Sequence, residues 1–229
     1  MRWDRLWRIR ATEIDPNNFV VAANLALLLN SCLKEYEGAE ALYKKILEND
    51  QTNVITWYNF ASLLDQGLMR PEEAKIMYQR AIDVNPNEPY IFVNRAALFL
   101  TAGDVEAARR DLGEVWQHGA GGNRVIARGL MLLALLDMLE NRDPQLPLKY
   151  LKAVMKAGFV PSPWAVDGLM QRLRRLLRPE GYRLASRILD ALADLSLLTE
   201  LDAIPVWRNV PEVELKGNWL ERFRGNLAR

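Results

Sequence analysis

Small and large apolar residues recur along the chain at the spacing of one α-helical face. Three segments carry an apolar triplet spread over two helical turns, namely Ala39, Tyr43, Ile46; Ala74, Tyr78, Ala81; and Ala108, Leu112, Val115. Residues seven apart lie on the same side of a helix, so each triplet predicts a buried helical face. The alanine lets two helix axes approach closely, and the larger residues fill the space beside it. The first of these helices is predicted over residues 36–49.

Each of these segments follows another whose residues repeat at a step of 35. The repeated phrases are Asn24-Leu25-Ala26, Asn59-Phe60-Ala61 and Asn94-Arg95-Ala96. The same step links Ala22, Trp57 and Phe92, which we assign to the packing face, and also Leu29, Leu64 and Phe99. Turn signals such as Asn85-Pro86-Asn87 separate the copies, and Gly67 and Gly103 mark turns inside the second and third copies. The pattern predicts stacked helix–turn–helix pairs, the first opening with a helix over residues 18–33.

The repeated residues resemble a known family. The residues that carry the resemblance are Trp57, Ala61, Leu64, Ala74, Tyr78, Ala81 and Pro86. This pattern is similar to the tetratricopeptide repeat, a helix–turn–helix unit of about 34 residues. The copies at 19–53 and 54–88 run one residue longer, and the third, from 89, closes its first turn one residue sooner. The resemblance implies an all-α fold, a right-handed solenoid of such repeats with irregular C-terminal helix pairs.

The remaining sequence is less regular and sets the expected domains. Residues 1–17 are expected to form a partial repeat or capping helix, and residues 18–118 three repeats. Residues 119–202 are expected to form irregular pairs, the first over 124–140 and 145–157 with a face of Leu146, Tyr150 and Ala153. The second is expected over 163–177 and 179–194, with a face of Ala185, Leu189 and Leu192. Residues 203–229 are read as an extended connector to 216 and a short helix over 217–228, folded back over the last repeat.

Composition narrows the class of protein. The 229 residues include 30 Lys and Arg against 29 Asp and Glu, so no net field favours nucleic acid or an anionic membrane. The single cysteine, Cys32, excludes an internal disulfide. The first residues carry charges where a signal peptide needs an apolar run, and no stretch approaches the ~20 apolar residues of a spanning helix. These features predict a soluble protein, with the cytoplasm as its expected compartment.

A polar stripe along the first helices is the candidate binding surface. Its members, at i, i+4, i+7 and i+11, are Val20, Asn24, Leu27, Ser31; Ile55, Asn59, Ser62, Gln66; and Tyr90, Asn94, Ala97, Thr101. Stacking should align the three asparagines on the concave wall of a solenoid. An asparagine side chain both donates and accepts, so it can hold a peptide bond without reading a side chain. In repeat proteins that resemble this chain, such asparagines hold an extended peptide.

The stripe predicts a non-catalytic protein-interaction module or assembly scaffold. The expected peptide-binding residues are Asn24, Asn59 and Asn94, with Tyr58, Tyr90, Asp65 and Gln66 supplying selectivity. The alternative is that the asparagines bond to neighbouring repeats and only hold the stack. The inner positions lack the basic residues of a carboxylate clamp, with Arg95 the one candidate. A second alternative is a structural spacer or self-assembling module of a larger complex.

A cluster of arginines offers a third alternative. Arg172, Arg174, Arg175 and Arg178 crowd the turn of one helix pair, and Arg183 and Arg187 follow. Such charge on two amphipathic helices is typical of a solvated face, and the alternative is a dock for an anionic partner such as nucleic acid or lipid.

Catalysis finds little support in the sequence. The glycine-rich stretch from His118 to Asn123 lacks the residues of a phosphate-binding loop and reads as a long turn. His118 has no nucleophile or base at a recognisable spacing, and with Cys32 it offers no metal-ligand pattern. No cofactor, metal or enzymatic activity is expected.

Overall fold

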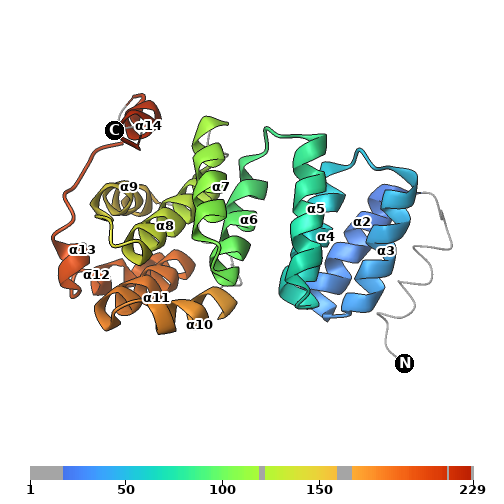
Figure 1. Cartoon of the computed structure of the whole chain (residues 1–229), viewed down its shortest axis with the longest axis horizontal. Coiled ribbons are helices and arrows are strands. Elements are labelled where there is room, and N and C mark those ends of the chain that lie inside the picture. The colour runs from blue at the N-terminus through green and yellow to red at the C-terminus, as the bar shows by residue number, and fades with distance from the viewer. Residues whose placement is uncertain (1–17, 119–121, 159–166, 216, 228–229) are drawn as a thin grey trace. The chain divides into compact units, whose positions relative to one another are not determined.

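The protein is all-α, as the sequence predicted. The computed structural model describes residues 18–118, 122–158, 167–215 and 217–227, which form helices joined by turns, with no strand among them. The chain divides into two compact units, unit 1 up to Asn87 and unit 2 from Glu88 (Figure 1). The helix expected within residues 1–17 lies outside the described residues. The domain boundaries at 17/18, 118/119 and 202/203 were placed where the repeat pattern of the sequence changes, and they stay predictions. The right-handedness of the solenoid also stays a prediction.

The described part of unit 1, residues 18–87, contains two helix pairs. Its elements are α2 (Phe19–Leu28), the π-helical turn η1 (Leu29–Leu33), α3 (Tyr36–Asn49), α4 (Val54–Ser62), the π-helical turn η2 (Leu63–Gly67) and α5 (Pro71–Val84). Successive helices pack on one another, α2 on α3, α3 on α4 and α4 on α5. Both predicted triplets are buried completely, with 0% exposure at every member. The alanine-and-aromatic periodicity therefore identified the core of this unit.

Both first helices of unit 1 begin with the same device. Asn18 and Asn53, one period apart, are the N-cap residues of α2 and α4. Their side-chain oxygens accept hydrogen bonds from Val21 N at 3.1 Å and Thr56 N at 2.9 Å. An asparagine here satisfies a backbone N–H that has no partner within the helix, which is why this residue type favours helix starts.

The turn inside each pair explains the step of 35. Leu29, Leu64 and Phe99 share one column, and each carbonyl closes the end of its first helix. In the first two copies the acceptor bonds to the amide six residues on, Glu35 N to Leu29 O at 2.9 Å and Arg70 N to Leu64 O at 2.7 Å. In the third, Asp104 N reaches Phe99 O over five residues at 2.9 Å. The extra residue of the first two copies is thus absorbed as a π-helical turn.

A left-handed residue closes each of these turns. It is Lys34 (φ 58°), Met69 (φ 55°) and Gly103 (φ 86°), and Asn141 (φ 56°) does the same after α8 (Asn123–Leu139). Gly103 and Asn141 are residue types that this conformation favours, whereas Lys34 and Met69 are not. Gly67, predicted to mark a turn, ends η2 instead. A Cβ there would lie 2.9 Å from Cδ1 of Tyr36, so close packing against that ring requires a glycine.

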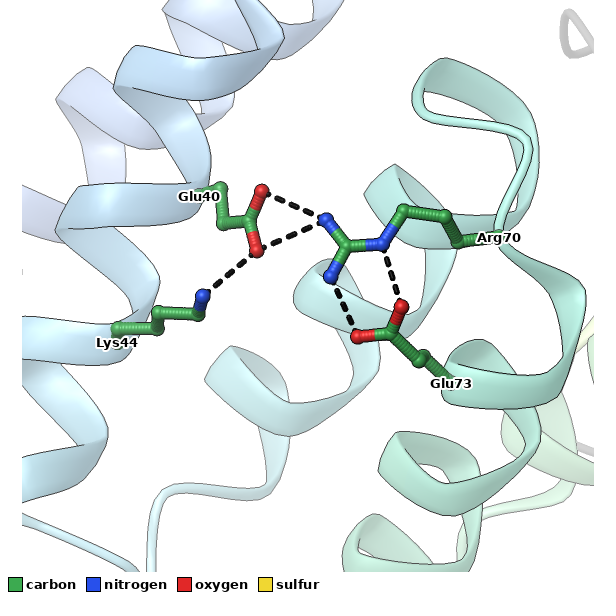
Figure 2. Close-up of polar contacts among 4 residues, drawn as sticks. All are labelled: Glu40, Lys44, Arg70 and Glu73. Carbon is green, nitrogen blue, oxygen red and sulfur yellow. Dashed lines mark hydrogen bonds and ion pairs between the residues drawn. The ribbon is translucent and has the colours of Figure 1, made fainter.

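An arginine joins the two pairs of unit 1. Figure 2 shows Arg70, the N-cap residue of α5, between Glu40 of α3 and Glu73 of α5. Its Nη1 donates to both Glu40 oxygens at 3.0 and 2.9 Å, and Lys44 Nζ lies 2.8 Å from the same carboxylate. Burial acts to raise the pKa of Glu40, but Lys44 and Arg70 outweigh it and hold the pKa below its ordinary value.

Unit 2 begins with two further pairs. They are α6 (Pro89–Ala102) with α7 (Val105–Gln117), and α8 with α9 (Gln145–Lys156). The predicted face of α7 is fully buried, and on α9 Tyr150 and Ala153 are buried while Leu146 is half-buried. Arg109 of α7 bonds to Asp137 at 2.8 Å and Glu140 at 2.5 Å, both at the end of the next pair's first helix. This arrangement mirrors Glu40 and Arg70 with the charges reversed.

The fifth pair does not continue the succession. It consists of α10 (Asp167–Leu176) and α11 (Pro179–Ala193). Helix α10 packs on α6 and α11 on α8, so the pair lies along the first helices of the two preceding pairs (Figure 1). The buried face of α11 is Leu184, Ala185, Ile188 and Ala191. The expected face was therefore wrong at Leu189, which is half-buried, and Leu192 lies outside the described side chains.

The C-terminal segment differs from its prediction. After η3 (Leu195–Leu197) and α12 (Leu198–Leu201), the expected extended connector over 203–216 contains a helical turn, α13 (Pro205–Arg208). Proline suits its first position, and Trp207 is 2% exposed. The buried Lys152 of α9 donates to the carbonyls of Trp207 at 3.4 Å and Val210 at 3.5 Å. The burial of Trp207 and the hydrogen bonds from Lys152 to two backbone carbonyls thus stabilise a folded segment, although its two prolines had predicted an extended one.

The terminal helix, α14 (Trp219–Leu227), is present as predicted. Its fully buried Phe223 meets Trp116 and Tyr150 edge to face, each with ring centroids 4.9 Å apart. These partners belong to α7 and α9, so the expected packing over the last repeat was wrong. The aromatic residues of three helices form one cluster instead.

Candidate partner-binding surface

The predicted stripe is open on the first helices of unit 1. Val20 is 72% exposed and Leu27 45% on α2, and Ile55 is 62% exposed on α4. Asn24 is exposed, and Asn59 is half-buried. Apolar side chains of this size, exposed together beside amides, form a surface that water covers poorly. We call the stripe residues of α2 and α4, with the π-helical turns that follow them, the first-helix face of unit 1.

Tyr58, Asp65 and Gln66, three of the residues expected to give selectivity, lie on α4 and η2 with Asn59. Tyr58 is half-buried, with its ring centroid 6.2 Å from that of Tyr78. Gln66 is exposed. Asp65 is half-buried, and burial raises the pKa of its carboxyl to about 6. The second copy thus combines an amide, an aromatic ring and a carboxyl that is poorly solvated.

The third copy of the stripe is not accessible in the same way. Asn94 is 6% exposed, and its amide donates to the carbonyl of Tyr90 at 2.7 Å, while Tyr90 is half-buried. Eight residues of α6 are buried, and they surround the helix axis, whereas α2 buries Ala26 alone among its ten residues. Helices α7, α8 and α10 all pack on α6, so unit 2 buries more of this helix with its own chain than unit 1 buries of α2.

Arg95 is held inside its own helix pair. Its Nε and Nη2 donate to the two carboxylate oxygens of Asp111 on α7, at 2.7 and 2.8 Å. The guanidinium also lies over the rings of Phe92 and Phe99, at 5.9 and 5.6 Å. This bidentate pair, which the sequence analysis missed, occupies the one basic candidate for a carboxylate clamp.

Trp57 is less buried than its column predicted. Its side chain is half-buried, and Nε1 donates to Gln51 O at 2.8 Å. It lines a cleft of about 310 Å³ with Gln51, Arg80, Asp83 and Val84. By contrast Phe92, in the same column, is 4% exposed. The assignment of Trp57 to the core was therefore wrong in degree. A repeated position predicts which side of the helix a side chain occupies, but not how fully neighbouring elements cover that side chain.

The arginine cluster lies on α10 and the turn after it. Arg174, Arg175 and Arg178 are exposed, and the side chain of Arg172 lies outside the described residues. Arg187 is instead paired with Glu200 at 3.0 Å. Leu169 and Leu173 on the opposite face of α10 are 4% and 1% exposed, so this helix is strongly amphipathic.

His118 and Cys32, the residues considered for catalysis or metal binding, contact neighbouring side chains. The ring of His118 stacks on Phe92 at 5.9 Å and lies 3.3 Å from Glu114, and Cys32 is exposed beside Ser31. Within the described part of the chain, no three His, Cys, Asp or Glu side chains gather as metal ligands would. Nor is any described helix long and apolar enough to cross a membrane.

Comparison with solved structures shows a distant similarity of fold. No family model matches the chain, and no curated protein matches it. Among solved structures, it is similar to a tetratricopeptide repeat protein from Parabacteroides merdae ATCC 43184, at 12% identity and a TM-score of 0.46, over 95% of this chain and 88% of the other. A similarity at this level identifies neither a family nor a function.

Proposed function

We propose that this chain is a non-catalytic protein-interaction module that binds a segment of a partner protein along the first-helix face of unit 1. The observation that carries the proposal is the contrast between copies of one stripe. In unit 2 the third copy is buried at Asn94 and half-buried at Tyr90, Ala97 and Thr101, whereas in unit 1 the first two copies expose Val20, Leu27 and Ile55. Covering such side chains is favourable by about 25 cal/mol per Å² of apolar area.

Hydrogen bonds from the asparagines would orient the partner's backbone, and contacts with the exposed apolar residues would supply most of the affinity. Asn24 and Asn59 can each donate to and accept from a partner's backbone. Each such bond is worth about 0.5–1.5 kcal/mol net, so two amides alone give weak binding. Tyr58, Asp65 and Gln66 would then discriminate among partners. Asn94 is buried and Tyr90 half-buried in unit 2, so we do not include them in this surface.

A structural spacer or self-assembling module is the alternative, and a matched pair of variants separates the two. Ile55→Glu places a charge on the first-helix face, and Ile76→Glu places one on α5, where Ile76 is 55% exposed against 62% for Ile55. Partners would be captured from the native host with each variant and identified by mass spectrometry. Loss of a partner with Ile55→Glu alone is expected, and equal capture by both variants would refute the proposal.

A further inference from the structure

We propose that the turn between α10 and α11 binds the surface of an anionic lipid membrane. The residues that would make the contact are four exposed arginines and one exposed leucine, namely Arg174, Arg175, Arg178, Arg183 and Leu176. We call these five residues the α10–α11 basic surface. They belong to unit 2, in which α10 and α11 lie below α8 and α9 in Figure 1, and this inference is independent of the partner-binding face of unit 1.

Positive charge is concentrated at this turn. Residues 172–186 contain five arginines and one glutamate, a formal charge of +4, although the whole chain carries only +1. Among the described residues, no carboxylate forms an ion pair with any arginine of the basic surface, whereas Arg187 is paired with Glu200 at 3.0 Å. Arginines that lie close together without acidic partners repel one another, and a negatively charged surface relieves that repulsion.

The electrostatics of the two helices explains only part of the cluster. Arg174 and Arg175 lie in the last turn of α10, where the helix end carries partial negative charge and basic side chains are stabilising. Arg178 is the N-cap residue of α11, where the helix end is positive, and its guanidinium has no acceptor for the free amides of that end. An arginine is therefore unfavourable there on local grounds, and an anionic ligand gives it a role.

The exposed leucine favours a lipid surface over nucleic acid. Leu176 is 52% exposed and lies between Arg175 and Arg178 in the sequence, whereas Leu173, three residues earlier, is 1% exposed. Helices that lie on membranes bury apolar side chains at the boundary of the acyl chains, while their basic side chains meet the headgroups. Contacts to nucleic-acid phosphates come from basic and polar groups and require no such leucine. The combination therefore matches an anionic headgroup layer.

The expected affinity can be apportioned between the two kinds of side chain. Each arginine close to an anionic membrane strengthens binding by about fivefold, so the removal of three should weaken binding by about a hundredfold. Burial of the exposed half of one leucine side chain also strengthens binding by about fivefold. Both contributions are large enough to measure separately.

Co-sedimentation of the full chain with lipid vesicles tests the proposal. The chain should bind vesicles of phosphatidylcholine and phosphatidylserine in equal parts, and it should not bind vesicles of phosphatidylcholine alone. Replacing Arg174, Arg175 and Arg178 together by glutamine should weaken binding to the mixed vesicles by about a hundredfold. The matched control replaces three other exposed basic residues by glutamine and so has the same net charge; they are Lys45, Arg80 and Arg124. Its affinity should stay close to that of the wild-type chain.

The leucine has a matched control as well. Leu176→Ser should weaken binding to the mixed vesicles by about fivefold. Ile76→Ser removes an apolar side chain of α5 that is exposed to a similar extent, 55% against 52%, and should leave the affinity unchanged. All of these side chains are exposed, and circular dichroism of each variant verifies that it is folded.

Each contrary outcome overturns a stated part of the proposal. Absence of binding to the mixed vesicles, or equal binding to both kinds of vesicle, would overturn the anionic membrane as the partner. Equal losses in the two triple variants would overturn the assignment to this turn, and equal affinities of Leu176→Ser and Ile76→Ser would overturn the contact with lipid. Tighter binding of a duplex oligonucleotide, dependent on the arginines but not on Leu176, would identify nucleic acid as the partner instead. None of these outcomes bears on the capture of partners by the first-helix face, which Ile55→Glu tests.

Discussion

Replacing Met69 by glycine should stabilise the protein. Met69 closes the turn between η2 and α5 with φ of 55°, a left-handed conformation that a side chain disfavours. The equivalent position of the third copy already holds Gly103, with φ of 86°. The Met69 side chain is 73% exposed, so its removal sacrifices little buried contact.

The expected gain follows from two opposing terms. Relief of the left-handed conformation is worth about 1–2 kcal/mol. Glycine gives the unfolded chain more freedom, which costs about 0.5–1 kcal/mol. The net increase in the free energy of unfolding is therefore between 0 and about 1.5 kcal/mol, with about 0.75 kcal/mol as the central value.

Urea unfolding followed by circular dichroism measures this difference. Met69→Ala is the control, because it removes the same exposed side chain but keeps the Cβ that causes the strain. Gly103→Ala should show the reverse effect and lower the stability of unit 2. If Met69→Gly were no more stable than Met69→Ala, the left-handed closure of the π-helical turn would be incorrect.

Three further predictions test the packing and the buried charges. Asp65→Asn should stabilise the protein by about 1–3 kcal/mol at pH 8. The pKa of the Asp65 carboxyl is about 6 in the folded protein, above its ordinary value of 3.8, so the stability of the wild-type protein falls as pH rises from 3.8 to 6. Thermal melts at several pH values should show that the stability difference between Asp65→Asn and the wild type disappears below pH 4. Arg95→Met should lower the free energy of unfolding in urea by about 3–5 kcal/mol, because it leaves Asp111 buried and unpaired. Adding Asp111→Leu should restore most of this stability, and a double variant no more stable than Arg95→Met would contradict the pairing. Phe92→Ala should cost about 3–5 kcal/mol and Trp57→Ala clearly less, and equal losses of melting temperature would contradict the difference in burial.

Periodicity predicted most of the local structure. The spacing of Ala39, Tyr43 and Ile46 gave the buried face of α3, and helix boundaries followed from turn residues and caps. These features depend on contacts within one pair or between neighbours, and a repeat encodes such contacts at every copy. In the sequence, the π-helical turns appeared only as a repeat of 35 residues where the family has about 34. The backbone hydrogen bonds of the structure were needed to show that the extra residue lies in a π-helical turn.

The sequence did not reveal how copies of one column differ in their surroundings. Asn24, Asn59 and Asn94 are identical in type, yet the first is exposed and the third is 6% exposed. Asn94 lies on a helix against which α7, α8 and α10 pack, and α10 begins more than 70 residues after Asn94, with no period linking the two segments. Long-range packing of this kind leaves no trace in local patterns, as the fold of residues 203–215 also shows.

Photo-cross-linking from two equivalent positions tests the central claim most directly. Benzoylphenylalanine would replace Ile55 of α4 in one chain and Tyr90 of α6 in another, positions that are one period apart, and adducts formed in the native host would be identified by mass spectrometry. Binding along the first-helix face of unit 1 predicts partner adducts from position 55 and none from position 90, which is half-buried in unit 2. Partner adducts from position 90 with none from position 55 would contradict the account.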